Sequence, residues 1–348
     1  MASLSTLIRS TSAIPRTGRW MSSPLLPAFL LLLLLFVRCS SALPKTHPLR
    51  AAADRVNRRG PYIGLVMAFP AESEALQASG VFVPASGVPF LDLFGRRFHI
   101  GSIHQVKVIY VMSGQRRLNA GITVQTLLDV FDVRGIVHYG TAGSANDSMS
   151  FGDVSVPKFT AFTGSWTWMK LESPDEPFPE LHIGEFNIPS KGGNSLSRIK
   201  FKTEEFYSAG KQMEEVFWLQ TNPEWFQVAE QLEVELQRCV NESYCLPEAP
   251  KIVFGLKAST ADVFLDNAAY REFLFKEFGV STVDEESAAV VMTAMSANVP
   301  VVVFRGVSDL AGGEATWSST MLSDIASINA LKVAVSFIAA IGKRRLSL

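Results

Sequence analysis

The amino-acid sequence predicts a three-layer α/β/α fold, in which helices cover both faces of a central, twisted, largely parallel mixed sheet. Apolar, β-branched runs alternate with stretches of helical periodicity along most of the 348 residues, and this alternation is typical of parallel sheets. The runs are apolar at successive positions, as in strands that are buried on both faces. With 47 % hydrophobic and 19 % charged residues, the composition excludes a disordered chain and supports a large core.

Five apolar runs are predicted to be strands. They cover residues 62–68, 106–112, 135–139, 251–256 and 299–307. Five further segments carry apolar residues at helical spacing and are predicted to be helices. They cover residues 118–131, 224–238, 267–277, 287–297 and 324–341. In the last of these helices one face is apolar, so we expect that face to pack on the sheet.

Two segments do not follow this alternation. Residues 43–60 are polar and basic with no apolar period, which predicts a flexible leading segment before a single domain at 61–348. Residues from about 163 to 221 are rich in Pro, Gly, Ser and aromatic residues. Because so long a loop within a domain is usually functional or inserted, we interpret this stretch as an insertion packed over one end of the sheet.

The first 42 residues have the composition of a secretory signal peptide. They contain four arginines, no acidic residue and an apolar run at 25–37, and Ser40 and Ala42 supply the small residues of a cleavage site. The apolar run is shorter than the roughly 20 residues that cross a bilayer, so an uncleaved anchor is the less favoured alternative. We expect no membrane association of the mature chain, entry into the secretory pathway, and a vacuolar or extracellular location.

The formal net charge of −1 hides an acidic mature chain. Four of the 32 basic residues lie in residues 1–42, so 28 basic side chains remain against all 33 acidic ones. Binding to nucleic acid by phosphate neutralisation needs the opposite balance. A nucleic-acid partner is therefore not expected.

Two cysteines, Cys239 and Cys245, remain after the predicted signal peptide. In an oxidising compartment they are expected to form a disulfide; two separate thiols are the alternative. Two Asn-x-Ser sequons make Asn146 and Asn241 candidate glycosylation sites. The spacings of a zinc site are absent from the sequence, so we expect no metal.

Acidic, small and basic residues follow several predicted strands, at the edge where ligands bind in open α/β sheets. Taken singly, each has an ordinary structural interpretation, because acids favour helix N-termini and glycines serve tight turns. Their joint placement at one edge favours a functional site. The GxGxxG, GxxxxGK[ST] and GxSxG motifs are absent from the sequence.

Three blocks of sequence resemble the nucleoside phosphorylase/nucleosidase superfamily, and the resemblance covers most of residues 61–341. The blocks are IGLVMAFPAESEAL, HYGTAGSANDSMSFGDVSVP and VDEESAAVVMTAMSANVPVVVFRGVSDLA. The sequence is similar above all to a plant bark storage protein-like branch, which shares the signal peptide and the SGQRRLNAG variant. The resemblance implies cleavage of the N-glycosidic bond of a purine-type nucleoside by a homo-oligomer that needs no cofactor.

The resemblance also implies roles for single residues. Asp309 matches the acid that gives a proton to the purine, and Glu286 matches the carboxylate that binds the ribose 2′- and 3′-hydroxyls. Glu72 matches the base that activates water, and Phe264 lies near the position of the aromatic residue that stacks on the base. The other residues expected at the substrate are Ser113, Gly143, Glu285 and Ser308.

Two departures from the family pattern affect the expected chemistry. Glu285 stands where methionine is common, which adds a second carboxylate beside Glu286 and changes the expected sugar preference. Arg116 stands where the hydrolytic branch has glycine, and a guanidinium can bind phosphate. Arg116 therefore favours phosphorolysis, with inorganic phosphate as co-substrate, whereas Glu72 favours hydrolysis.

The leading hypothesis is thus a nucleoside-cleaving enzyme whose attacking group is either water or phosphate. A vegetative or bark storage protein that keeps the fold with little or no catalysis is the main alternative. A nucleoside-binding module without turnover is a third. Release of free base by the purified protein separates the first hypothesis from the other two.

Overall fold

The computed structural model describes residues 42–168, 180–182, 198–241, 244–312 and 319–346. Residues 40–348 make up one compact unit. The predicted signal peptide lies outside the described residues except for Ala42, and so do the second and third residues of the Asn241 sequon.

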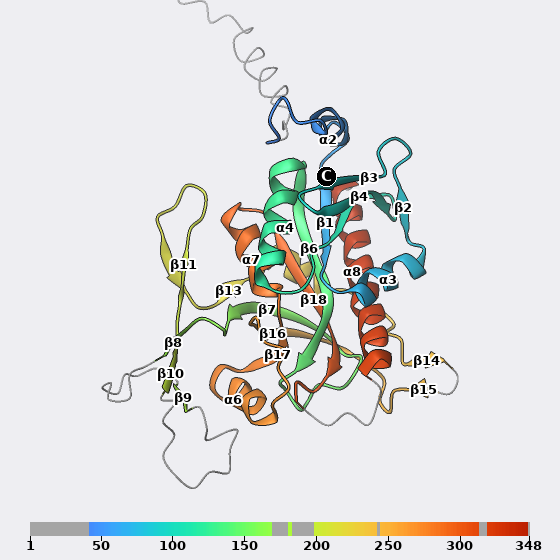
Figure 1. The fold of residues 1–348 in the computed structure, drawn as a ribbon. Helices are drawn as coiled ribbons and strands as arrows, with labels where there is room; N and C mark the ends of the chain where they lie inside the picture. Colours follow the sequence, from blue (N-terminus) through green and yellow to red (C-terminus); the bar gives the residue numbers. More distant parts are fainter. Residues whose placement is uncertain (1–41, 169–179, 183–197, 242–243, 313–318, 347–348) are drawn as a thin grey trace, which may run out of the picture. The chain divides into compact units, whose positions relative to one another are not determined.

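The centre of the molecule is a mixed sheet of eleven strands (Figure 1). Its parallel pairs are β1–β5, β1–β6, β6–β18, β7–β16 and β16–β17. These strands are β1 (Tyr62–Met67), β5 (Val106–Met112), β6 (Val133–Ser144), β7 (Val154–Phe162), β16 (Ile252–Thr260), β17 (Val280–Asp284) and β18 (Val301–Asp309). All five predicted strands are confirmed, with somewhat different ends.

Five strands of this sheet pair in a closed ring. β6 pairs with β18, β18 with β7, β7 with β16, β16 with β17, and β17 again with β6. The register sets Asp309 opposite Gly143 and Val283 opposite the same glycine. The ring therefore brings the carboxyl ends of β6, β17 and β18 to one place.

Antiparallel strands extend the sheet at both edges. β4 (Arg96–Ile103) pairs with β5, and β2 (Phe82–Pro84) and β3 (Phe90–Leu93) pair with β4. At the other edge β13 (Leu219–Gln220) pairs with β7. The sheet is therefore mixed, as the sequence predicts, with its parallel strands in the middle.

Helices cover both faces of the sheet (Figure 1). One apolar core cluster contains α4 (Arg117–Val130) and α7 (Ser287–Ser296), which supply among others Val124, Leu127, Val290 and Val291. The other cluster contains α3 (Pro70–Ser79), α5 (Pro223–Ala229) and α8 (Ser319–Leu346), with Leu76, Phe226, Phe337 and Ile338. The predicted three-layer arrangement and the predicted helices in α4, α7 and α8 are thus confirmed.

Helix α8 is the core helix of the second layer. Its residues Leu322–Arg344 are long and apolar enough to cross a membrane, but 67 % of the most apolar window is buried inside the protein. It packs against β18 and β6. Its apolar composition is therefore explained by burial inside the protein.

The helix predicted for residues 224–238 is wrong in its second half. α5 ends at Ala229, and the chain continues without a helix to Arg238. Leu232, Val234 and Leu236 alternate along this stretch and pack against the α8 core cluster. Apolar residues at every second position suit an extended chain, and this period of two outweighs the helical propensity of the intervening Glu and Gln residues.

Residues 43–60, which the sequence predicts to be a flexible leading segment, contain a helix. Residues 50–57 form α2 (Arg50–Asn57), whose Ala53 and Val56 are buried. Asn57 Nδ2 donates a hydrogen bond to Val130 O at 2.9 Å. Two buried apolar residues and one buried amide are enough to fix so short a helix against the end of α4, although they form no visible period in the sequence.

The described parts of the inserted segment form small antiparallel units. β8 (Trp166–Trp168), β9 (Glu180–His182) and β10 (Arg198–Phe201) make one sheet, and β11 (Glu204–Phe206) pairs with β12 (Glu214–Val216). The ring of Phe201 packs on Phe273 and Phe278 of α6 (Ala268–Phe278) at centroid distances of 5.9 and 4.9 Å. Aromatic packing thus joins this segment to the end of the sheet that carries α6.

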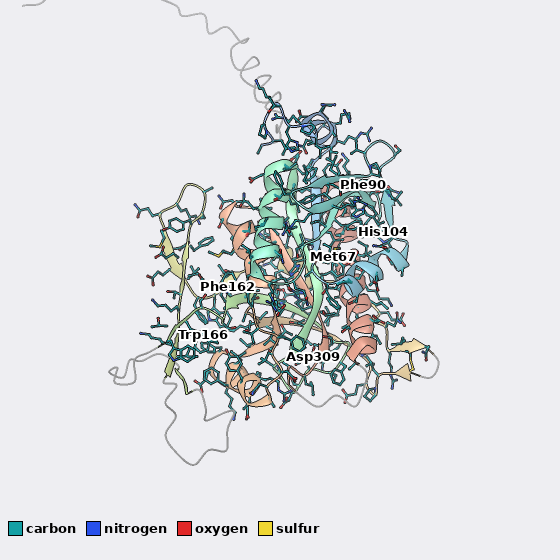
Figure 2. The ribbon with its side chains drawn as sticks, in the orientation of Figure 1. Met67, Phe90, His104, Phe162, Trp166 and Asp309 are labelled. Carbon is teal, nitrogen blue, oxygen red and sulfur yellow. A yellow bond between two sulfur atoms is a disulfide. The ribbon has the colours of Figure 1, made fainter. Side chains whose placement is uncertain are left out.

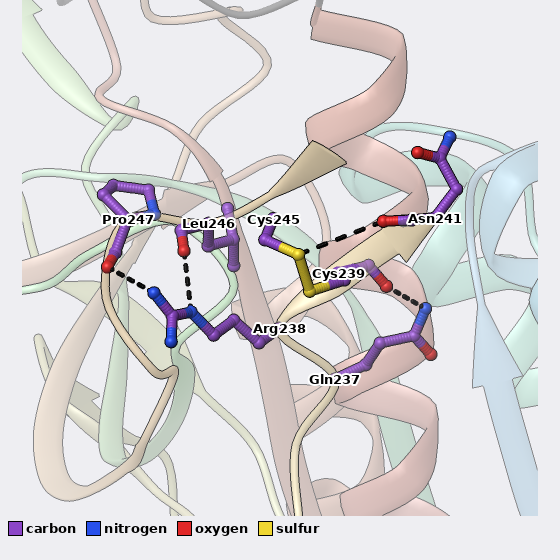
Figure 3. The surroundings of a disulfide bond; sticks show 7 residues. All are labelled: Gln237, Arg238, Cys239, Asn241, Cys245, Leu246 and Pro247. Carbon is purple, nitrogen blue, oxygen red and sulfur yellow. Dashed lines mark hydrogen bonds between the residues drawn. A yellow bond between two sulfur atoms is a disulfide. The ribbon is translucent and has the colours of Figure 1, made fainter. Parts of the chain in front are cut away.

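The structure joins Cys239 and Cys245 by a disulfide across the short hairpin of β14 (Cys239–Asn241) and β15 (Tyr244–Cys245), as Figure 3 shows. Arg238 supports the hairpin base by donating from Nε to Leu246 O at 2.8 Å. Asn241 is exposed, whereas Asn146 is partly buried, with its Oδ1 accepting from Ser148 N. Glycosylation of either asparagine stays a prediction.

Candidate active site

A cavity of about 420 Å³ opens at the carboxyl edge of the central strands. The ends of β1, β6, β17 and β18 and the loop after β16 form its wall, and Figure 2 labels Asp309 at this end of β18. The predicted site residues that line it are Glu72, Gly143, Phe264, Glu285, Glu286, Ser308 and Asp309. The fold thus brings together side chains that are up to 237 positions apart in the sequence.

Glu72 is held by the turn between β1 and α3. Its Oε2 accepts from the backbone N–H groups of Ala68 at 2.7 Å and Phe69 at 3.0 Å, which caps the start of α3. Its Oε1 accepts from Thr141 N at 2.7 Å and, more weakly, from Thr141 Oγ1 at 3.3 Å. Glu72 is 1 % exposed, so the carboxylate is fixed in one orientation by donors from the turn after β1 and from β6.

Gly140 leaves the space that Glu72 needs. A Cβ atom on this residue would overlap both Glu72 Oε1 and Arg305 Nη1. The two charged side chains therefore meet over the bare backbone of β6. No larger residue fits at this position without moving one of them.

Arg305 lies at the centre of the buried part of the site. Its side chain is fully buried, with Nε 2.9 Å from Ser287 Oγ and 3.2 Å from Asp284 Oδ2. Nη1 donates to Thr141 O at 3.2 Å, and Nη2 donates to Glu286 Oε2 at 3.1 Å. A buried guanidinium is tolerated here because carboxylates and neutral acceptors surround it.

His138 completes the surroundings of Arg305. Its Nδ1 lies 3.0 Å from Val66 O, and its Nε2 lies 2.7 Å from Arg305 Nη2. Since a carbonyl and a guanidinium allow only one arrangement of protons, Nδ1 carries the hydrogen and Nε2 accepts. Burial, together with the charge of Arg305, lowers the pKa of His138 to about 3, so the imidazole is neutral.

The two carboxylates at the start of α7 have different surroundings. Asp284 Oδ1 accepts from Thr260 Oγ1 at 2.7 Å and from the N–H groups of Glu286 and Ser287 at 3.0 and 2.9 Å. Burial alone would raise the pKa of Asp284, but Arg305 and these donors lower it. Asp284 is therefore an ionised cap of α7.

Glu286 faces the cavity with fewer donors. Its Oε1 accepts from Arg116 N at 2.9 Å and its Oε2 from Arg305 Nη2. Burial raises the pKa of Glu286 to about 7, although the charge of Arg305 opposes the rise. A buried carboxylate with lone pairs directed into a cavity can accept hydrogen bonds from two neighbouring hydroxyls.

Asp309 is oriented by its own loop. Oδ2 accepts from Ser308 Oγ at 2.9 Å and Oδ1 accepts from Ala311 N at 2.8 Å. A Cβ atom on Gly143 would lie 2.6 Å from Asp309 Oδ1. Gly143 therefore makes room for the carboxyl group of Asp309. The sequence predicted Gly143 at the substrate and gave no indication of this contact.

Two predicted site residues lie outside the cavity wall. Ser113 is buried, and its Oγ donates to Gly114 O at 2.8 Å. The Arg116 side chain is 64 % exposed, and its Nε lies 3.9 Å from Glu285 Oε2. Arg116 reaches the site through its backbone N–H group rather than through its guanidinium.

The cavity wall is acidic. Six of its residues are carboxylic acids, namely Glu72, Asp266, Asp284, Glu285, Glu286 and Asp309. In the described part of the chain, the wall contains no Lys, Arg or His, and the same residues include no group of His, Cys, Asp and Glu that could hold a metal ion. Behind the wall, each nitrogen of the Arg305 guanidinium has a partner within the protein.

Sequence reasoning did not assign roles to Arg305, His138 or Asp284. Arg305 is the one charged residue in the apolar strand VVVFRGV, and a charge in the middle of a doubly buried strand requires partners. His138 lies in another such run, IVHYG. That signal indicates burial of both residues, but the partners become visible only when β6 lies beside β18.

The fold belongs to a known class of proteins. The family model of the phosphorylase superfamily matches residues 62–341, and this chain therefore belongs to that superfamily. At the level of the family, this membership supports cleavage of nucleosides.

Several proteins are similar to this chain. It is 38 % identical to bark storage protein A of Populus deltoides over 288 residues, which cover 82 % of this chain and 90 % of that protein. It is 27 % identical to the 5′-methylthioadenosine/S-adenosylhomocysteine nucleosidase of Treponema pallidum, over 63 % of this chain and 72 % of that protein.

A solved structure of a 5′-methylthioadenosine/S-adenosylhomocysteine nucleosidase from S. pneumoniae, with a transition-state inhibitor, has the same fold. Its TM-score is 0.56 at 19 % identity, and the match covers 81 % of this chain and all of that one. The futalosine hydrolase of Helicobacter pylori matches with a TM-score of 0.55 at 20 % identity, over 82 % of this chain and 99 % of that one.

Proposed function

We propose that this protein hydrolyses the N-glycosidic bond of a purine-type nucleoside in the cavity at the carboxyl edge of the sheet. One observation carries the choice of water over phosphate: six carboxylic acids and no cation line the described wall. A phosphate dianion would face these carboxylates with no cation on the described wall to bind it, whereas water and a neutral nucleoside carry no charge that the wall repels.

The residues of the wall suit the steps of this reaction. Asp309 gives its proton to the purine as the bond to C1′ breaks, and the bonding electron pair stays on the base. Glu286 accepts hydrogen bonds from the ribose 2′- and 3′-hydroxyls and stabilises the positive charge that develops on the sugar. Glu72 takes a proton from the water that attacks C1′, so free base and free ribose are the products.

The arrangement of Glu72 supports its role as the base. Oε2 is occupied by two backbone donors, but Oε1 has one short hydrogen bond and one weak one from a hydroxyl that can rotate. Oε1 can therefore accept a water molecule at the cavity.

The test is base release from adenosine and from 5′-methylthioadenosine by the purified protein, with and without inorganic phosphate. We expect free base at equal rates in both conditions, with the free sugar (ribose or 5-methylthioribose) rather than a sugar phosphate as the second product. Release that depends strictly on phosphate would contradict hydrolysis and restore phosphorolysis.

Asp309→Asn tests the proposed acid. Because the amide cannot deliver the proton, kcat is expected to fall about 10²–10⁴-fold, with little change in the affinity for nucleoside. Asp92→Asn, an exposed aspartate on β3, is the matched control and should keep full activity. Equal turnover by Asp309→Asn would show that another group is the acid.

Storage without catalysis is the second candidate, because the bark storage protein of Populus deltoides shares 38 % identity over most of both chains. This function predicts no base release under any condition and no need for the carboxylates of the wall. A storage role together with entry into the secretory pathway would also suit the disulfide of the β14–β15 hairpin.

A further inference from the structure

Glu285 lines the cavity but has no task in the proposed reaction. It follows β17 and directly precedes Glu286, the carboxylate proposed to hold the ribose. Its side chain is only 13 % exposed, and burial raises its pKa. A nearly buried acid at a ligand cavity requires an explanation, because burying a carboxyl group is costly when it has no partner.

The protein supplies little to this carboxylate. Among the described residues no hydrogen-bond donor reaches it, and the cation that pairs with it, Arg116 Nε, lies 3.9 Å away on an exposed side chain. The neighbouring Asp284 receives three hydrogen bonds and the Arg305 ion pair. Glu285 therefore has the capacity to accept hydrogen bonds from a bound molecule.

Arg116 contacts both Glu285 and Glu286, the carboxylate proposed to bind the ribose. Its backbone N–H donates to Glu286 Oε1 at 2.9 Å, while its guanidinium faces Glu285 Oε2. Its φ of 80° and ψ of 158° belong to a region that glycine normally occupies. This backbone conformation places one residue against both carboxylates, so the two lie on the same wall.

The number of hydroxyl groups on ribose decides what Glu285 can bind. A ribonucleoside has three sugar hydroxyls, and two neighbouring ones are taken by Glu286 in the proposed function. The third is the 5′-hydroxyl, which can donate to a carboxylate. An alkylthio group at the same position has no donor and would bury apolar surface against a charged group.

We propose that Glu285 is a specificity-determining residue that selects nucleosides with a hydrogen-bond donor at the 5′ position over nucleosides with a 5′-alkylthio group. This inference rests on the proposed function, because it uses Glu286 as the ribose-binding residue. The Arg116 guanidinium, whose Nε lies 3.9 Å from Glu285 Oε2, partly opposes the rise in the pKa of Glu285 that burial causes.

The experiment measures kcat/KM for adenosine, 5′-deoxyadenosine and 5′-methylthioadenosine. The wild-type protein is expected to prefer adenosine by at least about tenfold over both analogues, because each lacks the 5′-hydroxyl. Glu285→Met should shift the ratio toward 5′-methylthioadenosine by at least about tenfold, and Glu285→Gln, which keeps an acceptor, should retain most of the preference. Glu277→Met, at an exposed glutamate of α6, is the matched control.

An unchanged ratio in Glu285→Met, or a wild-type preference for 5′-methylthioadenosine, would overturn the inference. If Glu285→Met does not fold, the wild-type comparison of adenosine with 5′-deoxyadenosine decides alone. If no nucleoside is cleaved, the proposed function fails, and calorimetric affinities for the same three nucleosides then decide the inference separately. Failure of all three to bind would overturn both.

Discussion

The candidate site has a buried half behind the cavity wall, held by strands, and an exposed half at the cavity mouth, held by loops, and the two halves differ in how their side chains are fixed. In the buried half, Arg305 contacts both His138 and Asp284, and Asp284 Oδ1 accepts from backbone N–H groups at the start of α7. In the exposed half, Phe264 is 76 % exposed and Arg116 is 64 % exposed. Rigidity is concentrated where the proposed chemistry takes place.

This difference has a physical cause. Charged groups that lose their water must regain every hydrogen bond from the protein, and only neighbouring strands in fixed register can supply so many donors and acceptors. Side chains at the mouth keep their water, so they can change without that penalty. The buried half is therefore expected to determine stability and catalysis together, and the exposed half to determine affinity and specificity.

The largest effect is expected when the buried cation is removed. Arg305→Met would leave Asp284 and Glu286 without their counter-charge, and the free energy of unfolding should fall by about 3–5 kcal/mol. Arg97→Met removes an equivalent partner from the exposed Arg97–Asp92 pair, where water screens the charges, so the loss of stability should be far smaller. Denaturant unfolding of both variants measures the difference, and equal losses would break the distinction between the two halves.

Acidification should lower the free energy of unfolding through the titration of His138 in the buried half of the site. The pKa of His138 is about 3 in the folded protein against an ordinary value of 6.5, so the unfolded chain binds a proton that the folded one refuses between these values. The free energy of unfolding contributed by this group therefore falls as pH drops from 6.5 toward 3. Glu286 acts in the opposite direction, because its pKa of about 7 lies above the ordinary value.

The contribution of His138 is isolated by comparing the wild-type protein with His138→Gln, which keeps an acceptor for Arg305 but does not titrate. The stability advantage of the wild type should shrink by on the order of 2 kcal/mol between pH 6.5 and 4.5. Unfolding curves at several pH values measure it. A constant difference across this range would mean that His138 is not kept neutral by burial beside Arg305.

The smallest effect on stability is expected at the mouth. Phe264→Ala removes an exposed ring from the cavity wall, so the free energy of unfolding should change by less than about 0.5 kcal/mol. Loss of stacking on the base should raise KM for nucleoside about five- to tenfold, since one aromatic contact is worth roughly 1 kcal/mol. A stability loss as large as that of Arg305→Met would contradict the division of the site into two halves.

A helix or strand was predictable from the sequence where a single hydrophobic period ran through the whole segment. The central strands and the long helix α8 carry uniform patterns, and they formed where expected. Residues 230–238 were not predictable as extended, because helix-favouring glutamates and an apolar period of two occur together there. α2 was missed because only two of its apolar side chains are buried.

The sequence by itself determined which carboxylates reach the active edge. Glu72, Glu286 and Asp309 each follow a buried strand, and parallel strands end on one side of a sheet. Only the tertiary structure decided which hydrogen-bond and ion-pair partners surround these carboxylates. The ring of β6, β18, β7, β16 and β17 brings Arg305 beside His138 and Asp284, and the fold leaves Glu285 short of partners and the guanidinium of Arg116 largely exposed. Such properties depend on distances between distant residues and on the water lost at each, and no local pattern in one chain encodes either.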